Sequence, residues 1–271
     1  MQQYLSLLGS TAVLMLVFYV IERVTPGESQ SSSGRWFNYL YYPIVLAWVL
    51  LLQVLMGPLY LQGLALVGGG VLPKFVGPVS GTIGTAVFTL VFAFLWDVWQ
   101  YWVHRWQHES AILWQTHKLH HADTAVNSSS QSRQHLLNYT LLSLLYVPMV
   151  MLFGSLAPHV AASFVMFRVW GFVIHMNAHV EFGPLTPIVT GPQYHRVHHS
   201  RLPQHVDRNF ATFFPAIDKM FGTYYRPLPG EFPPTGLVTG EPEPLVSAAT
   251  VAPFVAWYRA ARAAVSTRRS A

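Results

Sequence analysis

Hydrophobic residues occur along this chain in long, mostly apolar runs instead of the strict alternation that a half-buried strand would show. The first run covers residues 4–24, the second 37 to about 56, and the third about 82–103. A helix needs about 20 apolar residues to cross the ~30 Å hydrocarbon layer of a bilayer. No basic residue precedes the first run and no small-residue cleavage site follows it, so we interpret it as a membrane span and not as a cleaved signal.

Two further apolar runs, 136–153 and 160–174, are joined by the short turn 154–158. They predict a helical hairpin, although each run is near the lower length limit for crossing a bilayer. In the second span, the dipeptide Gly57-Pro58 is expected to bend or end the helix, because proline lacks the amide that a helix interior uses. The apolar residues beyond it then predict an interfacial or re-entrant piece.

The composition agrees with a membrane protein. The 271 residues are 52% hydrophobic and only 10% charged, whereas a soluble domain carries about 25% charged residues. The absence of cysteine excludes disulfides, zinc ribbons, thiolate-held clusters and cysteine nucleophiles. The basic residues behind the net charge of +5 are spread through loops that flank apolar runs, which favours membrane topology over nucleic-acid binding. We therefore expect an all-α integral membrane protein with four to five crossing helices.

Ten of the thirteen histidines fall into four short motifs of two kinds, HxxxH and HxxHH. They are His104, His108, His117, His120, His121, His175, His179, His195, His198 and His199. On a helix, residues three and four apart share a face, so each motif directs its imidazoles to one side. Neutral imidazole suits iron, zinc, copper and nickel, and ten ligands are too many for one ion. The pattern predicts a paired-metal site, built by both halves of the chain beyond the ends of apolar spans.

Asp97 and Arg168 are charged residues within the apolar runs that predict spans. Asp97 is seven residues before His104, about two helical turns, with Tyr101 between them. A carboxylate in a span is costly and tends to be functional, so we predict that Asp97 accepts a hydrogen bond from a ligand imidazole and fixes its orientation. The alternative is an interfacial carboxylate that faces water. Arg168 lies in the last run, where it should face protein or a cavity.

The distribution of basic residues predicts an orientation. If the histidine motifs face the cytoplasm, every Lys and Arg lies on that side except Lys74 and Arg168. This asymmetry supports five crossings, or an equivalent arrangement, with the N-terminus outside. The membrane would be the plasma or inner membrane in a bacterium and the endoplasmic reticulum in a eukaryote. The tail beyond Pro253 carries four arginines and predicts a surface-lying helix or a disordered basic end.

Residues 82–226 resemble the sterol desaturase / fatty acid hydroxylase superfamily of membrane enzymes. The segments that carry the resemblance are Asp97 and Tyr101 with HRWQH, then LWQTHKLHH, PQYHRVHHSR, DRNF at 207–210 and DKMFGTY at 218–224. The resemblance divides the chain into N-terminal transmembrane helices and a loop at 1–81, a catalytic domain at 82–226, and a Pro-rich, basic tail at 227–271. Ala211 and Ile217 depart from the family pattern, which weakens inference about the substrate subgroup.

The resemblance implies a di-metal centre that uses dioxygen and two electrons to attack an unactivated C–H bond of a lipid. The metal would be two iron ions, which zinc could replace in purified protein, and the ten histidines would be the ligands. Many family members keep an Asn in the third motif, so Asn177 or His179 would complete the coordination. Arg133 and His135 match a family segment after the second motif. The resemblance thus makes Arg133 and Asn177, beside Asp97 and Tyr101, candidates for supporting the ligands.

The lipid would enter from the bilayer and could be a sterol, a fatty acyl chain, an ether lipid, a carotenoid or an aminolipid. Hydroxylation is favoured weakly over desaturation. We recognise no haem-binding or flavin-binding domain, so electrons should come from a separate cytochrome, or from a ferredoxin with its reductase. A zinc-dependent membrane hydrolase is a competing hypothesis, although it normally places a carboxylate inside the motif, as in HExxH. Two further hypotheses are a metal transporter, which would hold its ligands near mid-membrane, and a catalytically inactive lipid-binding relative.

Overall fold

The protein is described here from a computed structural model that covers residues 2–30, 32–76, 81–154, 158–240 and 245–269. Within these ranges the chain is helical, without strands, and one isolated bridge joins Ser200 to Thr235. The helices are α1 (Gln2–Val24), α2 (Ser32–Leu66), α3 (Pro73–Val76), α4 (Gly81–Glu109), α5 (Ala111–His121), α6 (Leu136–Leu145), α7 (Val147–Phe153), α8 (Pro158–Ile174), α9 (Pro192–His198), α10 (Pro215–Met220), α11 (Leu245–Thr250) and α12 (Ala252–Arg269). Three short 3₁₀ turns are η1 (Ser128–Ser132), η2 (Gly183–Leu185) and η3 (Pro203–His205).

Four helical segments are long and apolar enough to cross a membrane: α1, α2, α4 and the pair α6–α7. In α8 the described apolar part, Ser163–Ile174, is shorter. Large apolar side chains such as Val13, Leu40 and Val54 are more than 60% exposed on the outside of the bundle. Such a surface is stable against lipid but not against water. The prediction of an all-α protein with four to five membrane-crossing helices is confirmed.

Helix α2 continues without interruption for 35 residues and contains both Pro43 and Pro58. The prediction was that the Gly57-Pro58 dipeptide bends or ends the second span, and the helix does not end there. Beyond it, α2 packs against α6 and α7, where the Tyr60 hydroxyl donates to the Ser143 carbonyl at 2.6 Å. Neighbouring helices make a proline tolerable inside a span, because they compensate the lost backbone contact.

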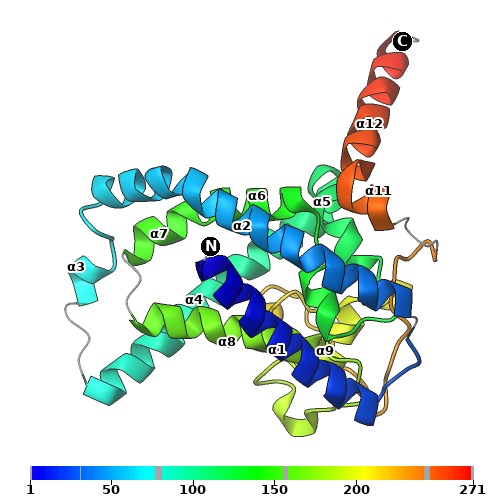
Figure 1. Ribbon diagram of the computed structural model, residues 1–271, viewed down its shortest axis with the longest axis horizontal. Coiled ribbons are helices and arrows are strands. Elements are labelled where there is room, and N and C mark those ends of the chain that lie inside the picture. Colours follow the sequence, from blue (N-terminus) through cyan, green and yellow to red (C-terminus); the bar gives the residue numbers. More distant parts are fainter. Residues whose placement is uncertain (1, 31, 77–80, 155–157, 241–244, 270–271) are drawn as a thin grey trace.

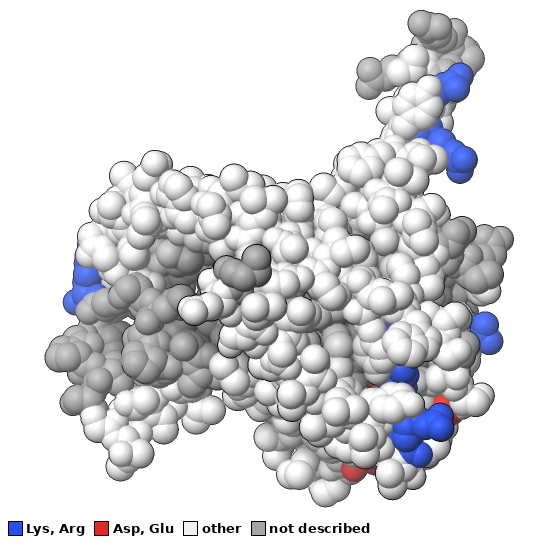
Figure 2. All heavy atoms as spheres, in the orientation of Figure 1, with Lys and Arg blue, Asp and Glu red and all other residues white. Residues whose placement is uncertain are grey.

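The predicted basic tail is helical, and α12 projects from the rest of the molecule (Figure 1). At its base the Trp257 indole N–H donates to the Ile112 carbonyl at 3.1 Å, which attaches α12 to α5. Figure 2 shows Lys and Arg side chains on α12 and at the end of the molecule that holds α9. The middle of the visible face, over α1 and α2, is without charge, as a lipid-facing surface requires.

The histidine motifs lie in a cap at the end of the bundle away from α3, formed by α5, α9, α10 and the irregular segments between residues 176 and 240 (Figure 1). The chain turns sharply from α4 into α5, because Ser110 caps α5 by accepting a hydrogen bond from the Leu113 amide at 3.3 Å. This turn packs α5 against the end of α4. The first two histidine motifs therefore face each other.

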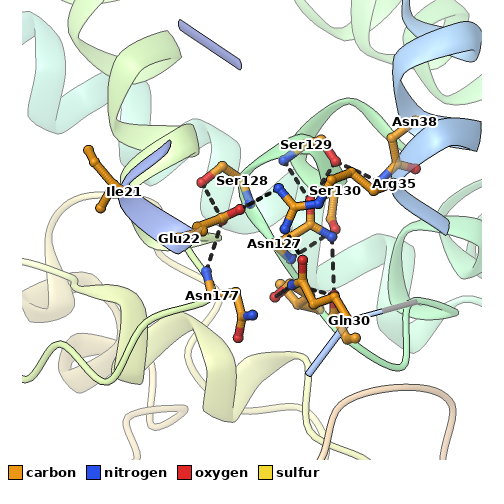
Figure 3. Close-up of polar contacts among 12 residues, drawn as sticks. Ile21, Glu22, Gln30, Arg35, Asn38, Asn127, Ser128, Ser129, Ser130 and Asn177 are labelled. Atoms are coloured by element: carbon orange, nitrogen blue, oxygen red, sulfur yellow. Dashed lines mark hydrogen bonds and ion pairs between the residues drawn. The ribbon is translucent and has the colours of Figure 1, made fainter. Parts of the chain in front are cut away.

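Glu22, near the end of α1, ties the first span to the cap (Figure 3). Its carboxylate accepts hydrogen bonds from the backbone N–H and the hydroxyl of Ser128 at 2.7 and 2.8 Å, and from the backbone N–H of Asn177 at 3.0 Å. The other oxygen pairs with Arg35 at 2.6 Å, and the Glu22 side chain is almost fully buried. One carboxylate thus joins α1 and α2 to the segments that follow the second histidine motif and overlap the third.

We expect Glu22→Ala to lower the thermal midpoint of the detergent-purified protein. Removing one partner of a buried, hydrogen-bonded ion pair costs about 3–5 kcal/mol, because the other partners remain unsatisfied. The matched control is Arg23→Ala, since Arg23 is adjacent but exposed. Equal melting of the two variants would show that Glu22 does not hold the spans to the cap.

Candidate metal centre

Nine of the ten predicted ligands gather in two groups in the cap. The first group contains His104 and His108 from α4, His117 and His121 from α5, and His198 from α9. The second contains His120 from α5, His175 directly after α8, and His195 and His199 from α9 and its end. In each group one nitrogen of every ring lies within 4.8 Å of the corresponding nitrogens of the others.

The Nε2 atoms of neighbouring rings point at each other at short range. The Nε2–Nε2 distance is 3.1 Å between His104 and His117 and 3.0 Å between His175 and His195. Imidazole nitrogens bind an ion such as zinc at about 2.0–2.1 Å, so two ligands at right angles would be ~3 Å apart. The spacing within each group therefore fits nitrogens that share one ion.

Three rings of the first group are held from outside by residues 207–210. In each case the ring's Nδ1 faces an oxygen of this segment, so the Nε2 lone pair is left for a metal. The pairs are His104 with the Phe210 carbonyl at 3.0 Å, His198 with the Arg208 carbonyl at 2.9 Å, and His108 with the Asp207 carboxylate at 3.3 Å. In the second group, His175 donates from Nδ1 to the Gly171 carbonyl at 2.7 Å.

Two buried carboxylates hold the backbone that continues from this segment. The amides of five consecutive residues, 210–214, donate to them at 2.7–2.9 Å. Asp218 accepts from the first two amides and Asp97 from the other three. The prediction that Asp97 accepts a hydrogen bond from a ligand imidazole is therefore wrong. Asp97 instead fixes residues 212–214, which closely follow the segment whose oxygens face the predicted ligands.

Tyr101 and Arg133 also make no hydrogen bond to a histidine within the described part of the chain. The Tyr101 hydroxyl lies 2.9 Å from the Thr223 hydroxyl, and its ring packs edge-on against Phe210. Arg133 forms a buried ion pair with Asp123 at 2.9 Å, immediately after the second motif. Both residues therefore support segments that carry the site and not the imidazoles themselves.

Asn177 and His135 are likewise engaged elsewhere. The Asn177 side chain exchanges hydrogen bonds with the backbone of Glu28, at 2.8 and 3.1 Å. His135 caps α6 by accepting from the Leu137 amide at 3.1 Å, and its Nε2 donates to the Thr250 carbonyl. Neither side chain belongs to a histidine group.

The structure does not bring His179 into either group. Its Nε2 lies 3.0 Å from the Gly27 carbonyl, and its ring packs in a tilted arrangement against Phe232 at 3.9 Å between centroids. The HxxxH spacing places two imidazoles on one face only if the motif is helical, but α8 ends at Ile174, before the motif begins. His175 and His179 therefore do not share a helical face.

Burial makes the clustered imidazoles neutral. Burial, followed by the proximity of other imidazoles, lowers the pKa well below the ordinary 6.5 for His117, His120, His121, His195, His198 and His199. Burial lowers the pKa of His175 to about 4. Neutral imidazole is the form that binds metals. The His198 Nε2 is buried and has no hydrogen-bond partner among the described residues, as expected of a nitrogen whose partner is an ion.

No role was predicted from the sequence for Asp207 or Asp218, although both lie in segments that carried the family resemblance. In the first of these segments, the residue types Asp207 and Asn209 were a signal of a tight turn. Asp207 and Asn209 adopt left-handed backbone conformations, with φ of 57° and 60°, which Asp and Asn tolerate better than most residues. Between these two residues the Arg208 carbonyl faces the Nδ1 of His198.

A cavity of about 530 Å³ extends from the histidines into the bundle. Its histidine end is formed by His104, His117, His120, His175 and His195. Its walls come from α2, α4, α6 and α8 and include Leu46, Leu142, Phe164 and Phe167. A mostly apolar chamber that ends on a cluster of ligands suits a long apolar molecule.

Comparison with known proteins gives one family match: a family model described as fatty acid hydroxylase matches residues 89–223. Alkylglycerol monooxygenase from Danio rerio is 36% identical over 129 residues, which is 47% of this chain and 28% of that protein. A Delta(7)-sterol 5(6)-desaturase from Gibberella zeae is 32% identical over 137 residues, 51% of this chain and 37% of that protein. An ornithine lipid hydroxylase from Rhizobium tropici is 28% identical over 128 residues, 47% of this chain and 38% of that protein.

The aligned part of this chain thus spans between a quarter and two fifths of the length of these relatives. No solved structure matches the chain.

Replacing one histidine of each group should remove metal from that group alone. We expect His198→Ala and His120→Ala each to lower the metal content by about one ion per chain, because each removes a ligand from a different group. His179→Ala is the matched control and should keep the wild-type content. Metal analysis of the purified variants measures this. Full content in His198→Ala, or a loss in His179→Ala, would contradict the two-group assignment.

Asp97→Asn should loosen metal binding although Asp97 touches no imidazole. An Asn side chain has only one acceptor oxygen, and its NH₂ would face amides that also donate. The expected result is faster loss of metal to a chelator, with the protein still folded in detergent. Glu109→Gln, an exposed change on the same helix, should lose metal at the wild-type rate. Equal rates for both variants would remove Asp97 from the support of the site.

Proposed function

Residues 89–223 place this chain in the fatty acid hydroxylase family, and from this membership we propose that it is a membrane-bound, dioxygen-dependent oxidoreductase that acts on a C–H bond of a lipid. The observation that carries the proposal is that both histidine groups contribute residues to one end of a mostly apolar cavity. The relatives include a lipid hydroxylase, a sterol desaturase and a monooxygenase. Between the two outcomes we propose hydroxylation.

The nine clustered histidines are the proposed ligands of two iron ions, five for one ion and four for the other. The donor set fits such ions, because the nitrogens are neutral and converge at about ligand spacing, and four of the rings are held through Nδ1. Iron bound there would supply the redox chemistry with dioxygen that an unactivated C–H bond requires. His179 is left out of the proposed ligand set, and zinc remains a substitute that the same nitrogens would accept.

The protein's own contribution is position and exclusion of water. The apolar walls of the cavity bind the hydrocarbon of the lipid and direct one segment of it at the histidines. Because the clustered rings are buried, water has little access to the reacting carbon. The carbonyls of Arg208 and Phe210 hold the Nδ1 protons of His198 and His104, so these rings keep their orientation during turnover.

The orientation and the electron supply are part of the same proposal. The distribution of basic residues supports a cytoplasmic cap, with spans α1, α2, α4 and α6–α7 in the bilayer. Electrons would come from a separate cytochrome or ferredoxin with its reductase. The proposed catalytic unit is residues 82–226, preceded by N-terminal spans and followed by the basic tail.

The proposal predicts oxygen-dependent consumption of a lipid by membranes that contain the protein. Membranes from iron-supplemented cells, given NAD(P)H and their own reductases, should form a lipid product whose mass is higher by one oxygen. Chemical analysis of total lipid under ¹⁸O₂ would show the label in that product. His120→Ala should abolish it and His179→Ala should not. A product with two hydrogens fewer and no label would establish desaturation instead, and zinc-dependent release of an acyl or phosphoryl group would establish a hydrolase.

A further inference from the structure

Arg168 is the only Asp, Glu, Lys or Arg among the described residues that line the histidine-ended cavity. It belongs to α8, in an apolar stretch where a guanidinium is costly unless it has a function. Its position in the cavity wall agrees with the sequence-based expectation that this residue faces protein or a cavity. The groups around Arg168 therefore decide whether its charge is compensated within the protein.

The described partners of Arg168 are neutral. Its Nη2 donates to the hydroxyl oxygens of Thr11, on α1, and Tyr42, on α2, the latter at 2.7 Å. The two hydroxyls also lie 2.8 Å from each other, and both residues are buried. Three helices thus fix the guanidinium in one position, as a preformed binding group requires.

No ion pair between Arg168 and a carboxylate occurs within the described residues. Its Nε and Nη1 make no hydrogen bond there either, so part of the guanidinium fork is left for a ligand in the cavity. In a low-dielectric interior an unpaired cation attracts an anion strongly, and the planar fork matches the two oxygens of a carboxylate or a phosphate. The other polar groups of the lining are neutral amides such as Gln100 and Gln131, hydroxyls such as that of Tyr139, and the histidine imidazoles.

The separation from the histidines suits the two ends of one molecule. Arg168 lies seven residues before His175, two helical turns, or about 10 Å along α8. Apolar residues lie between them in the cavity wall, including Phe172 and Ile174. A lipid bound to Arg168 by its polar end would therefore place its hydrocarbon chain before the histidines.

We propose that Arg168, oriented by Thr11 and Tyr42, binds an anionic oxygen group of the lipid substrate, a carboxylate or a phosphate. This inference rests on the proposed function, since it assigns the polar end of the substrate for the same cavity. It makes Arg168 a specificity-determining residue. The distance to the histidines then fixes which part of the chain is attacked.

The test is a binding measurement that needs no turnover. Tritiated palmitate bound to immobilised, detergent-purified protein is displaced by unlabelled palmitate, hexadecyl phosphate or hexadecanol, which share one chain and differ in the polar group. The wild-type protein should bind at least one anion about tenfold or more tightly than hexadecanol, the size of effect expected for a charge-assisted hydrogen bond. Palmitate stronger than hexadecyl phosphate identifies a carboxylate lipid, and the reverse order identifies a phosphate lipid.

Arg168→Gln should abolish the preference for anions, and Arg168→Lys should keep part of it. Arg23→Gln is the matched control, because Arg23 is exposed and lines a different crevice, between α1 and α2. If Arg168→Gln does not yield folded protein, Thr11→Val and Tyr42→Phe carry the test, since each removes one hydroxyl and should reduce the preference. Equal binding of the three probes by wild-type protein, or an unchanged preference in the variants, would overturn the inference. Failure of the proposed oxidation would leave this binding result unaffected.

Discussion

The arrangement of the site depends on two carboxylates that hold one stretch of backbone. Asp97 and Asp218 accept the amides of residues 210–214, and the segment just before them supplies the oxygens that face three imidazoles. Carboxylates are costly to bury, and here the cost is offset by several short hydrogen bonds to each. A displacement of either carboxylate would therefore shift the backbone next to the segment that faces three imidazoles.

Much of the fold and most of the candidate site could be predicted from the sequence. The spans follow from long apolar runs, and the clustering of nine histidines follows from motifs that lie just beyond those runs. Two of the errors come from the assumption that helices begin and end where local pattern suggests. Helix α2 continues through Pro58 and packs against α6 and α7. Helix α8 ends before His175, so the third motif does not place its two imidazoles on one helical face.

The supporting contacts could not be read from spacing. Asp97 was expected to face a histidine on its own helix, yet its partners are more than a hundred positions away in the chain. The same is true of Glu22, whose partners include Ser128 and Asn177. Such contacts depend on how loops cross the end of the bundle, and hydrophobic periodicity contains no information about that.

The two histidine groups differ in how far apart their members lie in the chain. Four members of the first group come from residues 104–121, on the consecutive helices α4 and α5. The second group needs residues from three separate segments. Closing a short loop costs less conformational entropy than closing a long one, and local contacts form sooner during folding. If each group holds one ion as proposed, the four histidines of α4 and α5 could bind theirs before residue 199 has been synthesised. The order of metal loading would then follow the order of synthesis, because the second group is complete only once residue 199 has been made.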